Sequence, residues 1–193
     1  MRDRRYRVLY WIAIAMAVFT VVWMLAEYLD VAGKYPGRIA YREGNRAFLD
    51  GRYEEALQKY GAALSEDARN VYAAEGIARS LQRLQRHAAA LAAFDAAIAI
   101  DPEFAAGIAN RGILLDTMGR HRDALKAYQA ALALDPDLSD GMHWIDRLLF
   151  NVQVRPPTID DRMRYLEEQL ALPAHRRVLV RPLEDLLQRP YER

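Results

Sequence analysis

Hydrophobic residues fill one stretch near the N-terminus without interruption. Residues 8–26, VLYWIAIAMAVFTVVWMLA, contain no charged side chain. At about 1.5 Å per residue, a helix over this stretch would be roughly 28 Å long, close to a hydrocarbon thickness of about 30 Å. Tyr10 and Trp11 lie near one end and Trp23 and Tyr28 near the other, where interfacial aromatic residues are expected. The pattern predicts a transmembrane helix over residues 8–28.

A cleaved secretory signal peptide is the alternative interpretation of the same stretch. Such a peptide has an apolar region of about 7–15 residues that ends in a small-x-small cleavage site. Here the apolar stretch is longer, and Met24-Leu25-Ala26 fits such a site poorly. Val31-Ala32-Gly33 is a second candidate that lies past two acidic residues. The sequence favours a retained anchor and leaves the signal peptide as the alternative.

The charges on either side of the span predict its orientation. Residues 1–7 carry one acid and four arginines, whereas Glu27 and Asp30 follow the span. The positive-inside rule then leaves residues 1–7 in the cytoplasm and carries the rest of the chain across, although Arg38, Arg42 and Arg46 weaken the bias. Only three of 27 basic residues are lysine, and this arginine and alanine richness is typical of a GC-rich bacterial genome. We therefore expect a bacterial inner-membrane protein whose C-terminal part is periplasmic.

Beyond a short tether at 29–36, apolar positions follow a helical period, and the pattern recurs every 34 residues. The units span 37–70, 71–104 and 105–138. Each predicts two antiparallel helices with small residues where they cross and an aromatic residue between units. The equivalent positions are Gly44, Ala78 and Gly112; Ala56, Ala90 and Ala124; Tyr60, Phe94 and Tyr128; and Ala63, Ala97 and Ala131.

This 34-residue pattern resembles that of the tetratricopeptide repeat family over residues 37–138. Gly51 and Gly119 mark the turn between helices, and Asp-Pro pairs end two of the units. The resemblance implies an all-α solenoid that binds proteins. The chain departs from the family at the tryptophan-like early position, and His87 and His121 replace a tyrosine that is kept as Tyr53.

The C-terminal third departs from the repeat. Residues 139–152 predict a capping helix with Met142, Ile145 and Leu149 against the stack. A helical tail follows over 153–193. Thr158 is the expected N-cap of a helix with an apolar stripe, and Pro182 begins a short helix with Leu183, Leu186 and Leu187. We expect the tail to fold back on the solenoid; docking of a partner on its leucine-rich face is the alternative. The stripe consists of Ile159, Met163, Leu166 and Leu170.

The net charge and the residue types present argue against nucleic-acid binding, metal binding and catalysis. The net charge is +1, which gives no field for nucleic acid, and the absence of cysteine removes thiol and Cys-based metal sites. No serine lies in a Gly-x-Ser-x-Gly elbow, and no glycine loop fits a phosphate. His87 and His121 are repeat-equivalent, which favours packing over metal ligation. We expect no enzyme, no cofactor, no metal and no small-molecule substrate.

By register with the family, the first helix of each unit would line the concave side of the solenoid. The mixture of tyrosine, phenylalanine and arginine there is typical of protein-binding hot spots, and a merely solvated face is the alternative. Some members of the family bind the C-terminal carboxylates of a peptide with basic residues from the first and third units. The third unit of this chain has Ala106 and Asn110 at those positions, so we do not expect this mode of binding. The expected lining is Tyr41, Arg42, Asn45, Phe48, Tyr72, Glu75, Arg79, Arg83, Ala109, Asn110, Ile113 and Asp116.

These observations together predict a membrane-anchored scaffold, assembly factor or accessory subunit of an envelope or membrane complex. Its partners would be proteins, and the short tether would hold the repeats near the membrane. The alternative is a permanent structural subunit that is held by its span and tail and leaves the lining unused.

Overall fold

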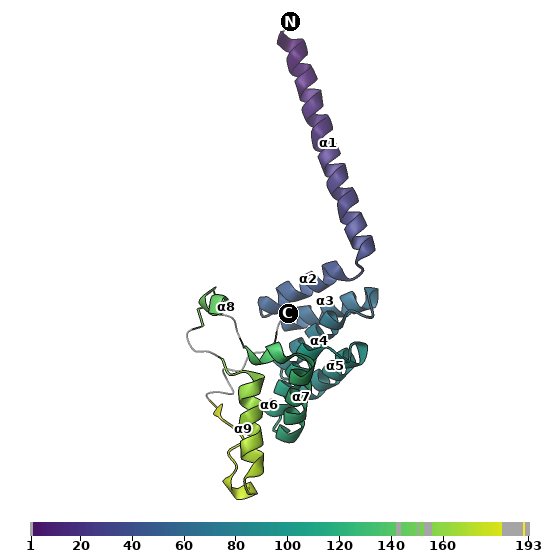
Figure 1. Cartoon of the computed structure of the whole chain (residues 1–193). Helices are drawn as coiled ribbons and strands as arrows, with labels where there is room; N and C mark the ends of the chain where they lie inside the picture. Colours follow the sequence, from purple (N-terminus) through teal and green to yellow (C-terminus); the bar gives the residue numbers. More distant parts are fainter. Residues whose placement is uncertain (1, 142–143, 150, 153–155, 183–190, 192–193) are drawn as a thin grey trace.

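The computed structural model describes residues 2–141, 144–149, 151–152, 156–182 and 191. Within these residues every regular element is a helix, which confirms the all-α prediction (Figure 1). The α-helices and the two 3₁₀ helices are α1 (Arg2–Lys34), α2 (Arg38–Leu49), α3 (Tyr53–Glu66), α4 (Val71–Arg83), α5 (His87–Ile100), α6 (Ala105–Thr117), α7 (His121–Leu134), η1 (Pro136–Ser139), α8 (Trp144–Leu149), α9 (Ile159–Ala171) and η2 (Ala174–Arg176).

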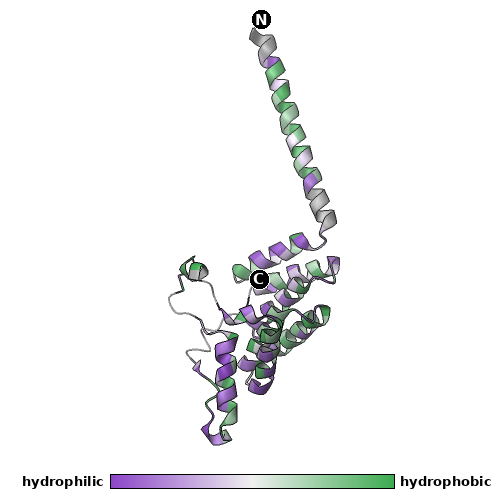
Figure 2. Cartoon of the chain, viewed as in Figure 1, coloured by the Kyte–Doolittle hydropathy of each residue, from purple (hydrophilic) through white to green (hydrophobic). Residues whose placement is uncertain are grey.

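Helix α1 projects away from the packed helices (Figure 1), and its middle part consists mostly of hydrophobic residues (Figure 2). Its segment Tyr6–Glu27 has a mean hydropathy of 2.3, is not buried by the rest of the chain, and is long and apolar enough to cross a membrane. The helix continues to Lys34, so most of the expected tether is helical. The chain turns at Gly37, whose φ of 77° and whose amide hydrogen bond to Glu66 fix the entry to α2. The candidate span is therefore joined closely to the repeats.

The three repeats are the helix pairs α2–α3, α4–α5 and α6–α7, which stack side by side (Figure 1). The predicted partnership of small and aromatic residues holds them together. The buried ring of Tyr60 lies between two glycines, and a Cβ added at Gly44 or Gly76 would meet it at 2.7 or 2.6 Å. Tyr128 lies equally close to Gly112 in the third repeat. Only glycine leaves room for these rings, so the helix crossings depend on it.

The turn inside each repeat has the same geometry three times. Gly51, Gln85 and Gly119 are all left-handed, with φ of 77°, 59° and 75°. In each turn the following arginine amide bonds to a carbonyl five residues back, at 2.8–2.9 Å, which is the Schellman closure of a helix. Gln85 pays the conformational cost that glycine avoids in the other two repeats.

The capping helix does not form as the sequence predicts. Helix α8 has six residues, and Ile145 and Leu149 are 43% and 72% exposed, so the prediction that they face the stack is wrong. Met142 lies outside the described residues. Helix α9 covers the third repeat instead: Ile159 and Leu166 are fully buried against α7 and η1. The expectation that the tail folds back is confirmed for α9, whereas Leu183, Leu186 and Leu187 lie outside the described residues.

Candidate protein-binding face

The residues expected to line the concave side lie on the first helices of the three repeats, whose shared side we call the first-helix face. It is formed by α2, α4 and α6, and side chains bridge neighbouring helices across it. The Arg79 guanidinium lies 4.7 Å from the centre of the Phe48 ring, which joins α4 to α2. Asn110 donates a hydrogen bond of 2.6 Å to Glu75, which joins α6 to α4. The face is therefore continuous over three repeats.

The first two repeats leave their part of this face open. Tyr72 is 48% exposed and touches Phe104 edge-on, with ring centres 5.6 Å apart. Arg83 is exposed and donates two hydrogen bonds, of 2.8 and 3.0 Å, to the Tyr53 hydroxyl. These contacts hold aromatic rings and arginines in place without burying them. We call this region the open part of the face: Tyr41, Arg42, Asn45, Phe48, Tyr72, Arg79 and Arg83.

Two of its members are partly committed to packing. Asn45 accepts a 2.7 Å hydrogen bond from the Tyr60 hydroxyl, and the Tyr41 ring lies 5.9 Å from that of Tyr60. Both side chains are half-buried. Their first role is to fix Tyr60 between the glycines, so a partner would meet mainly the other members of the open part.

The third repeat does not present its part of the face to solvent. Asn110 is 1% exposed, and Ile113 and Asp116 are 8% exposed, because the C-terminal region lies over them. Glu75 of the second repeat is buried at the same boundary. The three third-repeat residues expected in the lining are therefore interior in this structure, and Ala109 is fully buried with them.

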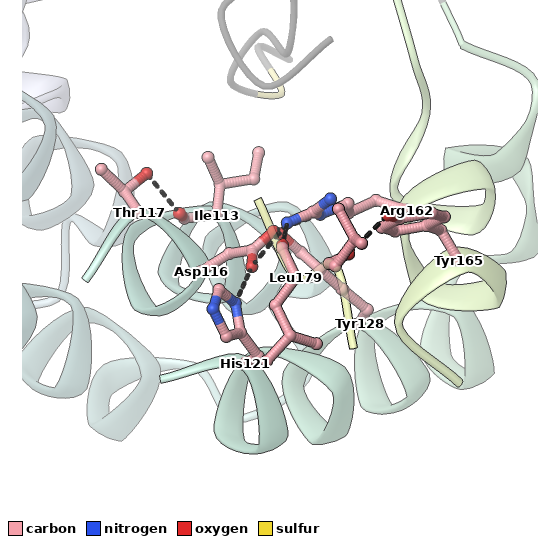
Figure 3. Close-up of polar contacts among 9 residues, drawn as sticks. Ile113, Asp116, Thr117, His121, Tyr128, Arg162, Tyr165 and Leu179 are labelled. Atoms are coloured by element: carbon pink, nitrogen blue, oxygen red, sulfur yellow. Dashed lines mark hydrogen bonds and ion pairs between the residues drawn. The ribbon is translucent and has the colours of Figure 1, made fainter. Parts of the chain in front are cut away.

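A buried ion pair anchors α9 on this covered region (Figure 3). The Arg162 guanidinium donates to both carboxylate oxygens of Asp116, at 2.6 and 3.1 Å, and also to the Leu179 carbonyl at 2.8 Å. The His121 Nδ1 lies 2.7 Å from the same carboxylate, and the Tyr128 hydroxyl donates to it at 3.4 Å. One aspartate of α6 thus gathers contacts from α7 and α9.

His121 has a role that its repeat-equivalent lacks. The His87 Nε2 lies 3.1 Å from the side-chain oxygen of Gln85, in an exposed position. His121 instead contacts a buried carboxylate, so simple packing does not describe it. Among the described residues, no three His, Asp or Glu side chains gather closely enough to hold a metal ion. The Asp116 cluster is built to join helices.

The C-terminal end of the chain also reaches this region. The Tyr191 amide donates to the Asn110 side-chain oxygen at 2.8 Å, and the Asn110 side chain donates back to the Tyr191 carbonyl at 2.9 Å. The Tyr191 hydroxyl donates to the Leu138 carbonyl at 2.9 Å and accepts from the Ile159 amide at 3.1 Å. Neither Arg162 nor Tyr191 was predicted as a functional residue from the sequence.

Comparison with known proteins identifies the repeats. Two family models described as tetratricopeptide repeat match residues 41–103 and 105–138, which together make up about half of the chain. No curated protein matches the chain in sequence.

Solved structures share the fold. The first TPR of Spaghetti (RPAP3), bound to an HSP90 peptide, has a TM-score of 0.56 at 20% identity; the match covers 70% of this chain and 94% of that one. The first TPR domain of human RPAP3 has a TM-score of 0.56 at 21% identity and covers 70% and 92% of the two chains. The crystal structure of MamA has a TM-score of 0.51 at 20% identity and covers 58% and 67%.

Proposed function

Because the chain belongs to the tetratricopeptide repeat family, we propose that it is a membrane-anchored module that binds another protein on the open part of its first-helix face. The observation that carries the proposal is the pairing of an unburied apolar helix with exposed tyrosine and arginine on the first two repeats. Tyrosine and arginine are the residues that most often dominate protein interfaces.

The short connection between the candidate span and the repeats favours membrane proteins as partners. Helix α1 runs on to Lys34, and only three residues separate it from α2 at Arg38. So short a connection keeps the repeats near the bilayer surface and raises the effective concentration of membrane-protein partners. By the positive-inside rule, residues 1–7 lie in the cytoplasm and the repeats in the periplasm of a bacterial cell. The module would serve an envelope complex as a scaffold, assembly factor or accessory subunit.

We do not expect this chain to bind a peptide in the way that Spaghetti binds its HSP90 peptide. Capture of a peptide's carboxylates needs basic side chains on the first-helix face. The third repeat offers Ala106 and Asn110 there, and both are buried. We expect a partner whose chemistry suits aromatic stacking and arginine contacts on the first two repeats.

Crosslinking capture from native membranes tests the binding face. Tyr72→Ala and Arg83→Ala should each weaken capture of the partner by about thirtyfold, because truncating a central hot-spot residue costs about 2 kcal/mol or more. Arg122→Ala is the matched control, since Arg122 is exposed on α7, a second helix. Normal capture by both face variants, with unchanged melting temperature, would refute this use of the face.

Topology and anchoring need separate experiments. A reporter fused after Arg193 should be active only in the compartment opposite the N-terminus, and the protein should stay in membranes washed with high salt. The mass of the mature protein decides between anchor and signal peptide, because cleavage would remove residues 8–26. Cytoplasmic reporter activity, release by salt, or a shortened chain would each overturn the corresponding part of the proposal.

A permanent structural subunit that leaves the lining unused is the second candidate. The buried Asp116–Arg162 pair favours it in one respect, because the chain's own α9 occupies the third-repeat part of the lining. Washing purified membranes in detergent separates the two. A fixed subunit stays stoichiometric with its complex and tolerates Tyr72→Ala, whereas an assembly factor dissociates.

A further inference from the structure

The contact between Tyr191 and the third repeat is organised like the recognition of an extended peptide. The Asn110 carboxamide donates to the Tyr191 carbonyl and accepts from its amide, so it pairs with one residue's main chain on both sides. Its second N–H is held by Glu75 at 2.6 Å, which fixes the plane of the carboxamide. Main-chain pairing of this kind is independent of the side chain that is bound.

The Tyr191 side chain is bound by other groups than its main chain. Its hydroxyl donates to the Leu138 carbonyl in η1 and accepts from the Ile159 amide. Ile159 is the first residue of α9, whose amide has no partner within its own helix. The tyrosine hydroxyl supplies that partner, and its ring packs against the apolar cluster of the third repeat. Phenylalanine could fill the same space but would leave both groups without this bond.

We propose that the third repeat carries a binding site for a peptide segment that contains a tyrosine, and that Tyr191 of the chain's own C-terminal end is the resident ligand. The site consists of Glu75, Asn110, Leu138 and Ile159. Residues up to Leu179 are held on α9 through the Arg162 and Tyr165 side chains. The occupant is therefore tethered by about a dozen residues, and such a tether gives an effective concentration in the millimolar range. An outside segment of the same chemistry must compete with it.

A labelled peptide of residues 182–193, PLEDLLQRPYER, tests this with the full-length protein in detergent. We expect Tyr191→Ala protein to bind the peptide at least about tenfold more tightly than wild type, because its own occupant is weakened. A peptide with phenylalanine in place of the tyrosine should bind that variant about tenfold less tightly. Fluorescence anisotropy measures both affinities.

A matched pair of double variants locates the site. Tyr191→Ala combined with Asn110→Ala should lose at least about tenfold in peptide affinity, whereas Tyr191→Ala combined with Asn70→Ala should keep it, because Asn70 is the N-cap of α4 and is not part of the proposed site. Equal affinity of wild type and Tyr191→Ala, no binding by a folded Tyr191→Ala protein, or equal loss in both double variants would overturn the proposal.

A measurement on wild-type protein guards against a variant that does not fold. Excess tyrosine peptide should speed amide exchange in the C-terminal segment, and the phenylalanine peptide should do so less. Unchanged exchange at a millimolar concentration of the tyrosine peptide would overturn the proposal. Both experiments leave the open part of the first-helix face untouched, so their failure is distinct from failure of partner capture through Tyr72.

Discussion

Replacing Arg162 by methionine should release the tail from the third repeat. Arg162 and Asp116 have side chains 7% and 5% exposed, and the guanidinium contacts both carboxylate oxygens. Methionine keeps the aliphatic stem and removes the charge. Asp116 would then remain buried with His121 and Tyr128 as its neighbours. Removing one member of a buried ion pair costs about 3–5 kcal/mol, because the other charge loses its partner without regaining water.

Thermal unfolding followed by circular dichroism measures this cost. For a chain of this size, 1 kcal/mol corresponds to roughly 2–4 °C, so Arg162→Met should lower the melting temperature by about 6 °C or more. Amide exchange should rise first in α9, because α9 depends directly on this pair. Arg164→Met is the control on the same helix. Its exposed pair with Asp160 at 2.8 Å should contribute a shift of about 2 °C or less.

The double variant Arg162→Met with Asp116→Leu, compared with the two single variants, completes a double-mutant cycle. Replacing a buried pair by apolar residues of similar volume is often neutral or stabilising, so the double variant should recover most of the loss. The reasoning would be refuted by a shift below about 2 °C for Arg162→Met. It would also be refuted by a double variant as unstable as the sum of the two single ones.

Three further predictions concern the repeats. Gly112→Leu should cost about 1–3 kcal/mol or more in unfolding free energy, since even a Cβ there would lie 2.7 Å from the Tyr128 ring; an unchanged denaturation midpoint would contradict this. Gln85→Gly should raise stability by about 0.5–1 kcal/mol, because φ is 59° and relief of the left-handed strain exceeds the entropy cost of glycine; a loss in urea titration would contradict it. His121→Tyr should lose about 0.5–1.5 kcal/mol with the Asp116 contact, while His87→Tyr should change the melting temperature little.

The repeats could be predicted because their signals are local and occur three times. Gly44, Tyr60 and Ala63 recur with a 34-residue period, and each recurrence places a small residue where helices cross. The aspartate at the end of each unit recurs more widely than the two Asp-Pro pairs indicate. Asp67, Asp101 and Asp135 all end a second helix in the same extended conformation, and each side chain accepts the amide hydrogen bond two residues on. This turn forms with or without a following proline, which explains why the first unit can have Ala68 where the other two have Pro102 and Pro136.

The covered part of the face could not be predicted, because it depends on contacts between distant residues. Asn110 and Tyr191 are 81 positions apart, and Asp116 and Arg162 are 46 apart. The register of the repeat correctly brings Asn110 and Asp116 to the first-helix side, but it carries no information on what covers them. The prediction of the capping helix failed for a related reason. The apolar pattern of α8 resembles that of a first helix, but the apolar residues that are buried on the third repeat belong to α9.

The two attachments of the C-terminal region differ in kind, and this difference bears on how the protein could work. Ile159, Arg162 and Leu166 lie three and four residues apart and therefore share one face of α9. Apolar contacts alone would hold this helix without fixing its position, because the hydrophobic effect is not directional. The Arg162–Asp116 pair fixes the position, and with it the Ile159 amide that the Tyr191 hydroxyl bonds. Helix α9 thus completes the solenoid, while the Tyr191 site, which rests on hydrogen bonds and one ring, is the attachment that a competing segment can replace.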